Sequence, residues 1–187
     1  MSDLKPMGES YWVEAGKLLA GEHPGHWDER VARRRVSGLL DAGIRTFIDL
    51  SGCGDNVHPY VAELESICGD RGIDVDYLRR PLREEVLPER AEDVAYILQD
   101  IKSAIDSGRR VYVHCSEGVG RTGLVVGCWL VERGFDPEDA LDELARRFAA
   151  MNKAKYCRMT PTSGLQAEWV ENWHPRLGQV AERSQAC

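Results

Sequence analysis

The stretch VYVHCSEGVGRTGLVVGCWLV, residues Val111–Val131, places a glycine-rich turn between two apolar segments. The first segment predicts a buried strand, and the second, which begins at Arg121, predicts a buried helix. Gly118 and Gly120 in this turn are expected to adopt backbone angles that a side chain would forbid. The N–H groups of the turn and the positive end of the helix dipole then form a cradle for an anion. The stretch therefore predicts a phosphate-binding loop at a strand-to-helix junction.

Strand-like and helix-like segments alternate on both sides of this stretch. This alternation predicts a single α/β domain, in which helices flank a central, mostly parallel sheet. We expect one domain over residues 1–187, with a core from about 11 to 173 and a loose tail over 174–187. The predicted strands and hairpin are Tyr11–Gly21, Ile44–Leu50, Ile73–Leu82 and Arg109–Cys115. The predicted helices are Arg30–Ala42, Tyr60–Arg71, Pro88–Ser107, Arg121–Glu132, Glu138–Phe148 and Leu165–Trp173, and Met151–Gly164 is read as irregular.

Three loops leave the carboxyl ends of the predicted parallel strands. They are Ser51–Pro59, Leu82–Pro88 and Cys115–Arg121. Ligands of open α/β sheets bind beyond these strand ends. The glycine-rich turn is thus expected at the edge of the sheet where ligands bind.

Composition excludes several classes of protein. The chain has 24 Lys and Arg against 31 Asp and Glu, a net charge of −7, which disfavours nucleic-acid binding. No apolar run is long enough to insert into a membrane, and the polar start MSDLKPMGES lacks a signal peptide's apolar middle, so a cytoplasmic location is expected. None of the six cysteines lies in a cluster with metal-ligand spacing, so no metal or other cofactor is expected. Without a secretion signal, the cysteines are expected to be reduced thiols. The sequence carries no signal for an oligomeric state.

Cys115 and Arg121 stand at the two ends of the turn. A thiolate at the lip of an anion cradle is stabilised and becomes a nucleophile near neutral pH. Arg121 can hold two phosphate oxygens in a fork, and Thr122 can donate a hydrogen bond to the sulfur. The competing interpretation is a buried structural thiol beside a tight turn. It is disfavoured because Arg121 would then be a costly charge between apolar segments.

The segment HCSEGVGRTG resembles the H-C-x5-R-[ST] signature of the cysteine-dependent protein tyrosine and dual-specificity phosphatases. YWVEAGKLLAGEHPG, FIDLS, PLREEVLP and the Trp-containing end are similar to a bacterial dual-specificity-like branch, so the resemblance spans roughly Tyr11–Trp173. It implies a phosphatase-type strand, phosphate loop and helix. It also implies a phosphocysteine intermediate on Cys115, with no metal. The implied substrate is a phosphorylated protein, above all on tyrosine, held by Ser116, Glu117, Gly118, Val119, Gly120, Arg121 and Thr122.

The resemblance places a general acid about thirty residues before the nucleophile. Related sequences have an aspartate there, whereas PLREEVLP has Glu84 at that position, with Glu85 next to it. The extra methylene of glutamate displaces the carboxyl group. Glu84 is the candidate acid and Glu85 the second choice, although both also suit a solvated acidic loop before a helix. Asp55 is a weaker alternative, for which a turn-forming role is favoured.

Several further residues have both a functional and a structural interpretation. By resemblance, Gln166 positions the hydrolytic water; otherwise it is an exposed polar residue on the last helix. His114 is expected to orient the loop rather than act as a base, and Asp49 to be a structural carboxylate. Lys153, Lys155 and Arg158 lie in the irregular segment, and the sequence does not place them.

Arg79, Arg80 and Arg83 precede the candidate acid and motivate a second hypothesis. If they face the site, a phosphoinositide or an inositol polyphosphate becomes the substrate; a solvated strand is the favoured interpretation. A third hypothesis, a phosphate-binding pseudophosphatase, follows from the missing aspartate. It is disfavoured because a pure binder has no need for a reactive thiolate.

Overall fold

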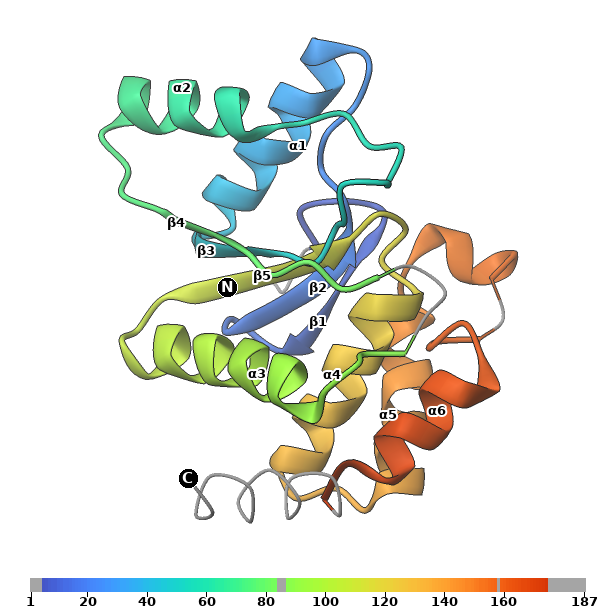
Figure 1. Ribbon diagram of the computed structural model, residues 1–187. Helices are drawn as coiled ribbons and strands as arrows, with labels where there is room; N and C mark the ends of the chain where they lie inside the picture. The colour runs from blue at the N-terminus through green and yellow to red at the C-terminus, as the bar shows by residue number, and fades with distance from the viewer. Residues whose placement is uncertain (1–4, 84–86, 158, 175–187) are drawn as a thin grey trace.

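The computed structural model describes residues 5–83, 87–157 and 159–174. Its centre is a five-stranded sheet in the order β1-β2-β5-β3-β4 (Figure 1). The strands are β1 (Ser10–Glu14), β2 (Leu18–Glu22), β3 (Ile44–Asp49), β4 (Asp76–Arg79) and β5 (Arg110–Cys115). β2, β5, β3 and β4 run parallel, and β1 pairs antiparallel with β2 at one edge. The predicted mostly parallel α/β sheet is confirmed.

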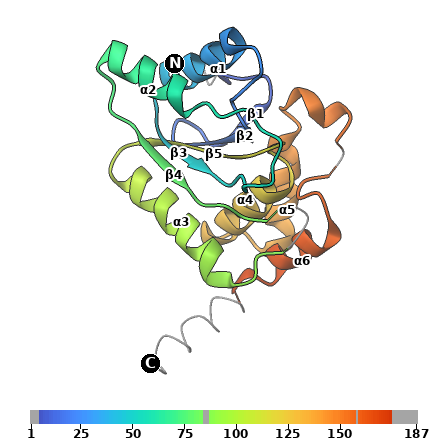
Figure 2. The same ribbon diagram turned by 45° about the horizontal axis from the view of Figure 1, so that its top comes forward.

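Helices cover both faces of the sheet, as Figures 1 and 2 show. One face packs against α1 (Glu29–Asp41) and α2 (Val61–Arg71), around an apolar cluster that includes Phe47, Leu39 and Leu64. The other face packs against α3 (Ala91–Asp106), α4 (Gly120–Glu132) and α5 (Pro137–Phe148), and α6 (Gly164–Glu171) packs on α4 and α5. A short 3₁₀ helix, η1 (Asn152–Lys155), lies between α5 and α6.

The central helix α4 is buried along most of its length because it packs among α3, α5 and α6. Its apolar residues continue around the whole helix rather than along one stripe, which is typical of a helix enclosed by other elements. The position of α4 directly after β5 fixes the turn between them at the carboxyl edge of the sheet. β5 itself lies between β2 and β3, so the turn has neighbours on both sides.

Element boundaries differ from the sequence predictions by a few residues at most places. The largest difference at a helix start is in α3, which begins at Ala91 rather than at Pro88. Arg90 before it has an extended backbone, with φ −138° and ψ 143°, and its guanidinium pairs with Asp93 at 2.9 Å. Met151–Gly164, read as irregular, contains η1. Among the described residues, no helix has the length and apolar character needed to cross a membrane.

Candidate active site

Cys115 is the last residue of β5 and stands opposite Glu22 of β2 in the parallel register. Its side chain is buried, and its Sγ accepts a hydrogen bond from the backbone N–H of Gly118 at 3.2 Å. The turn after β5 therefore folds back over the sulfur. A backbone donor aimed at the sulfur stabilises the charged thiolate form.

The carbonyl groups of this turn are held from outside by donors from other segments. Ser116 O accepts from the backbone N–H of His23 at 3.2 Å. Glu117 O accepts from Lys153 Nζ at 2.9 Å, and Val119 O accepts from Thr160 Oγ1 at 3.0 Å. In a trans peptide the N–H points opposite to the C=O. Carbonyls bound outward thus turn the N–H groups of the same peptides inward, which is the geometry of an anion cradle.

Two glycines of the turn are required for different reasons. Gly118 has φ +71°, and a Cβ there would lie 2.4 Å from the carbonyl carbon of Gly21. Gly120 does not have the positive φ expected from the sequence. Its reason is space, because a Cβ would lie 2.7 Å from Thr162 Oγ1. Gly118 thus allows the turn to press against β2, and Gly120 allows the start of α4 to approach the segment before α6.

Arg121, in the first turn of α4, joins the three loops at the carboxyl edge. Its Nη1 lies 2.6 Å from Asp55 Oδ2 and donates to Leu82 O at 3.2 Å and Leu50 O at 3.4 Å. The side chains of Arg121 and Asp55 are 4% and 5% exposed. These contacts orient the guanidinium plane through one nitrogen. Arg121 therefore brings together the three loops that leave the carboxyl ends of the parallel strands.

Asp55 has a second role beyond the turn that the sequence predicted. Its Oδ2 accepts from Gly52 N at 3.2 Å, as a turn-forming aspartate does, and the same oxygen pairs with Arg121. The sequence reasoning missed this pair. The signal for it was available: a buried arginine needs a counter-charge, and a carboxylate lay in a loop at the same sheet edge.

The candidate acids Glu84 and Glu85 lie outside the described residues. The described chain before them ends at Arg83, and Leu82, two residues before Glu84, has its carbonyl on Arg121. After the gap it resumes at Leu87.

The three arginines that precede the candidate acid contact residues other than Cys115 and Arg121. Arg79 lies 3.7 Å from Cys53 Sγ, Arg80 Nε donates to Asp100 at 2.7 Å, and Arg83 pairs with Glu89 at 3.0 Å. Arg80 lines a separate cavity of about 470 Å³ beside α3. Arg158 lies outside the described residues, and Lys155 is exposed.

Behind Cys115, His114 and Asp49 belong to a buried hydrogen-bond network. His114 Nε2 lies 2.8 Å from Tyr60 Oη, and the carboxylate of Asp49 accepts from Ser51 N at 2.8 Å and from Tyr77 Oη at 2.6 Å. Burial lowers the pKa of His114 to about 3, although Asp49 acts to raise it. Burial by itself would raise the pKa of Asp49, but His114, Tyr77 and Ser51 together lower it.

His114 is therefore neutral at physiological pH and Asp49 is charged. Donor atoms of His23, Asp49 and His114 lie within 4.8 Å of one another, an arrangement that can hold a metal ion. Both oxygens of Asp49 and the Nε2 of His114 are already hydrogen-bonded. The cluster fits a network that supports the strand end better than a cation site.

A cavity of about 660 Å³ opens beside the turn. The turn contributes Cys115, Glu117, Val119, Gly120 and Arg121, and the segment that leads into α6 contributes Cys157, Met159, Thr162, Ser163 and Gln166. Gln166 is buried rather than exposed, and its Oε1 has no hydrogen-bond partner among the described residues. Thr122 is fully buried, and its hydroxyl likewise has no partner within the described chain.

The strand β5 ends in a buried cysteine, and the carbonyl groups of the next turn are hydrogen-bonded from outside. An arginine follows at the start of α4. This arrangement is typical of a cysteine-dependent phosphate-binding site. The chain belongs to the family described as "PTP-SAK: Swiss Army Knife protein, DSP-PTPase phosphatase domain", which matches residues 9–172. The sequence-based assignment to the protein tyrosine and dual-specificity phosphatase superfamily is thereby confirmed.

Two viral proteins are similar in sequence. The chain is 27% identical over 128 residues to a candidate tyrosine phosphatase, 067L, of Invertebrate iridescent virus 3. It is 28% identical over 132 residues to a candidate tyrosine phosphatase, 197R, of Invertebrate iridescent virus 6. The matches cover 66% and 68% of this chain but 46% and 44% of the viral proteins, so the chain spans less than half the length of these relatives.

Solved phosphatase structures share the fold. A kinase associated phosphatase superposes with a TM-score of 0.69 at 17% identity, over 91% of this chain and 94% of that one. Tk-PTP in its active form gives a TM-score of 0.65 at 20% identity, over 90% and 97%. PTPMT1 in complex with PI(5)P gives 0.64 at 18% identity, over 92% and 98%.

Proposed function

We propose that this protein hydrolyses phosphate monoesters, with phosphotyrosine in proteins as its main substrate, through a phosphocysteine intermediate. The observation that carries the proposal is the placement of Cys115 Sγ and Arg121 along one cavity, with Gly118 N–H on the sulfur. Membership of a phosphatase-domain family supports the reaction class.

In the first step, the Cys115 thiolate attacks phosphorus; an S–P bond forms and the P–O bond to the leaving group breaks. The N–H groups of the turn and the guanidinium of Arg121 hold the charge of the transferring phosphoryl group. Asp55 orients Arg121 through Nη1. Geometry of this kind is sensitive, since a misplacement of about 1 Å can cost ~100-fold in rate.

We assign the general acid to Glu84. It protonates the leaving oxygen in the first step and takes a proton from the attacking water in the second, which breaks the S–P bond. The support is its chain position two residues after Leu82, whose carbonyl contacts Arg121. Glu85 is the second choice, and the ion pair of Asp55 with Arg121 favours an orienting role for Asp55 instead.

Gln166 and Thr122 are proposed to assist the second step. Gln166 lines the cavity with a buried carbonyl oxygen that needs a donor, so a water bound there would be held near the phosphocysteine. Thr122 can donate to the departing sulfur. Its buried hydroxyl, unpartnered among the described residues, is compatible with this role.

The cavity favours a monoester on an aromatic or apolar group over a polyphosphorylated one. Arg121 is the only cation among its lining residues within the described chain, and Glu117 adds a carboxylate. Met159 also lines the cavity and is exposed, as are Tyr156 and Leu165 in the same part of the chain. The ion pairs of Arg80 with Asp100 and of Arg83 with Glu89 weaken the support for a phosphoinositide substrate.

The free thiols of Cys53, Cys68, Cys115, Cys128 and Cys157 support our expectation that the protein acts in the reducing cytoplasm.

The direct test is turnover of para-nitrophenyl phosphate and of a phosphotyrosine peptide. Cys115→Ser should abolish phosphate release while keeping phosphate binding, because serine is a far weaker nucleophile at neutral pH. Cys68→Ser, on α2 across the sheet, is the matched control and should retain activity. Unchanged turnover in Cys115→Ser would refute the mechanism.

A substrate panel tests the specificity. We expect the phosphotyrosine peptide to be preferred over a phosphoserine peptide and over inositol polyphosphates, with no loss of activity in Arg80→Ala or Arg83→Ala. A preference for inositol polyphosphates that disappears in Arg80→Ala would favour the second hypothesis instead.

A further inference from the structure

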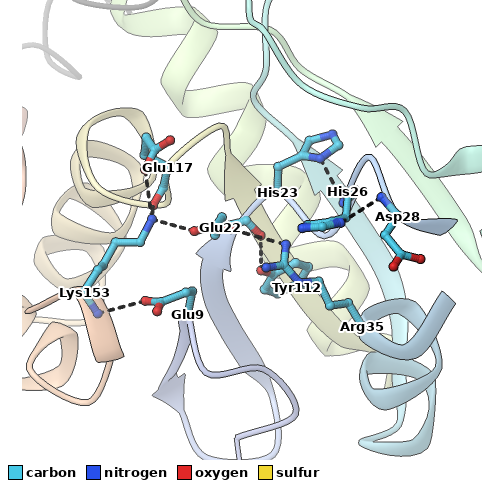
Figure 3. A network of polar contacts seen from close by, with 10 residues as sticks. Glu9, Glu22, His23, His26, Asp28, Arg35, Tyr112, Glu117 and Lys153 are labelled. Atoms are coloured by element: carbon cyan, nitrogen blue, oxygen red, sulfur yellow. Dashed lines mark hydrogen bonds and ion pairs between the residues drawn. The ribbon is translucent and has the colours of Figure 1, made fainter. Parts of the chain in front are cut away.

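Lys153 reaches the cysteine turn from a distant part of the chain. It lies on η1, between α5 and α6. Its backbone N–H donates to Glu9 Oε2 at 3.0 Å, and its side chain, 15% exposed, runs toward β2 and the turn. Figure 3 shows Lys153 between Glu9, Glu22 and Glu117.

All three hydrogens of the Lys153 ammonium have acceptors. Nζ lies 2.6 Å from Glu22 Oε2, 2.9 Å from Glu117 O and 3.0 Å from Glu117 Oε2. An ammonium has three N–H donors and accepts nothing, so this arrangement saturates it. Burial alone would lower the pKa of Lys153, but the hydrogen bonds to Glu22 and Glu117 raise it above its usual value. Lys153 therefore remains charged at physiological pH.

The acceptor Glu117 O belongs to a peptide group that also touches the nucleophile. The N–H of that same peptide is the N–H of Gly118, which donates to Cys115 Sγ at 3.2 Å. Because a trans peptide is planar, with C=O and N–H opposed, fixing the oxygen fixes the direction of the N–H. A cation on the carbonyl also polarises the peptide and strengthens its N–H as a donor.

Lys153 also balances charge beside the cradle. Glu22 ends β2 opposite Cys115, and its Oε1 pairs with Arg35 of α1 at 3.3 Å. Without Lys153, the carboxylates of Glu22 and Glu117 would lose a shared cation near the place where a phosphate must bind. Like charges there would oppose an anionic substrate.

We propose that Lys153 is a positioning residue, which holds the Glu117–Gly118 peptide so that its N–H faces the Cys115 sulfur and the bound phosphate. The proposal rests on the proposed function, in which Cys115 is the nucleophile. Lys153 belongs to the irregular segment whose position the sequence did not predict. For this role, the hydrogen bond from Lys153 to the carbonyl oxygen of Glu117 is essential, and the ion pair with the Glu117 side chain is not.

The test compares Lys153→Met with Lys155→Met, a matched control that removes an exposed lysine from the same 3₁₀ turn. In Lys153→Met we expect kcat/KM for para-nitrophenyl phosphate to fall by about 10- to 100-fold. The rate of alkylation of Cys115 by iodoacetamide at neutral pH should fall roughly fivefold, as expected from the loss of one hydrogen bond's worth of stabilisation. Lys155→Met should change neither rate, and Lys153→Arg should recover part of both.

A double variant separates positioning from charge balance. In Lys153→Met/Glu117→Gln the carboxylate that Lys153 neutralises is removed, while Glu22 keeps its ion pair with Arg35. Charge balance is then restored, but the Glu117–Gly118 peptide is still not held. We expect both rates to remain low. Full recovery in the double variant, or an alkylation rate equal to that of the wild type in Lys153→Met, would overturn the proposal.

The alkylation readout does not depend on turnover. If the wild type releases no phosphate from any ester while its alkylation rate still drops in Lys153→Met, the proposed function fails and the positioning role stands. If the wild type turns over and Lys153→Met alters neither turnover nor alkylation, the positioning role alone fails.

Discussion

The cysteine turn and the ring of donors around it are encoded in different ways. The turn is local: Cys115 to Arg121 is one motif, and its residues are recognisable in the sequence. The donors that hold its carbonyls come from His23, Lys153 and Thr160, which have no common pattern. The short motif therefore provides the residues of the anion cradle. Residues elsewhere in the chain determine which way the N–H groups of the cradle point.

Loss of the guanidinium geometry should have the largest effect. Arg121→Lys keeps the charge but cannot offer a fork of parallel donors. We expect kcat for para-nitrophenyl phosphate to fall by about 100- to 1000-fold, with a smaller change in KM. Steady-state kinetics measures the changes in kcat and in KM separately. Activity within a few fold of the wild type would show that a point charge is sufficient.

Removal of the charge that orients Arg121 should have the next largest effect. Asp55→Asn keeps the size and the turn but removes the ion pair at 2.6 Å. We expect kcat/KM to fall by about 10- to 100-fold, with the alkaline limb of the pH dependence of kcat/KM still present, because Glu84 is the group that must be protonated in the first step. In Glu84→Gln that limb should disappear. If the limb disappears in Asp55→Asn instead, Asp55 is the acid and our assignment is wrong.

Removal of one of the hydrogen-bond donors that hold the carbonyls of the turn tests whether these donors affect catalysis. Thr160→Val leaves the shape of the side chain but removes the hydrogen bond to Val119 O at 3.0 Å. We expect a loss of about 1 kcal/mol in the free energy of unfolding and a several-fold lower kcat/KM. Thr46→Val is the control, since the buried Thr46 hydroxyl on β3 has no partner among the described residues. Equal kinetics in the two variants would mean that the donor ring does not affect catalysis.

The prediction with the smallest consequence for turnover concerns the residues behind the turn, and it appears as a pH dependence of stability. Burial holds the pKa of His114 at about 3, below its ordinary 6.5, and burial also lowers the pKa of His23. Below pH 6.5 the unfolded chain binds protons that the folded protein does not. The free energy of unfolding should therefore fall as the pH falls, by up to about 1.4 kcal/mol per pH unit for each histidine.

Urea denaturation at several pH values between about 7 and 5 measures this slope, above the range in which Asp49 titrates. His114→Gln removes one of the two histidines, so we expect the slope to be roughly halved. An unchanged slope would assign the dependence to His23 or to other groups.

The fold and the ends of the turn could be predicted from the sequence because their signals are local. Alternating apolar segments indicated the parallel sheet, and Cys115 and Arg121 fall within one short motif. The pair of Asp55 with Arg121 and the burial of Gln166 were not predicted, because both depend on how separate loops pack. Gly120 was assigned the wrong physical reason, since only the fold reveals which segment approaches it. Lys153 could not be placed because its acceptors belong to β2 and to the turn.

The distant origin of these donors has a consequence for the newly made chain. Only five residues separate Cys115 from Arg121, yet their turn also needs contacts with Lys153 and Thr160, which come later in the chain. Domains fold as units during synthesis, so a nascent chain that has just exposed Cys115 still lacks two of the donors that shape the turn. The thiol should acquire its full reactivity only after residue 160 has emerged and docked. The fold thus delays the chemistry of its most reactive group until the surrounding structure is complete.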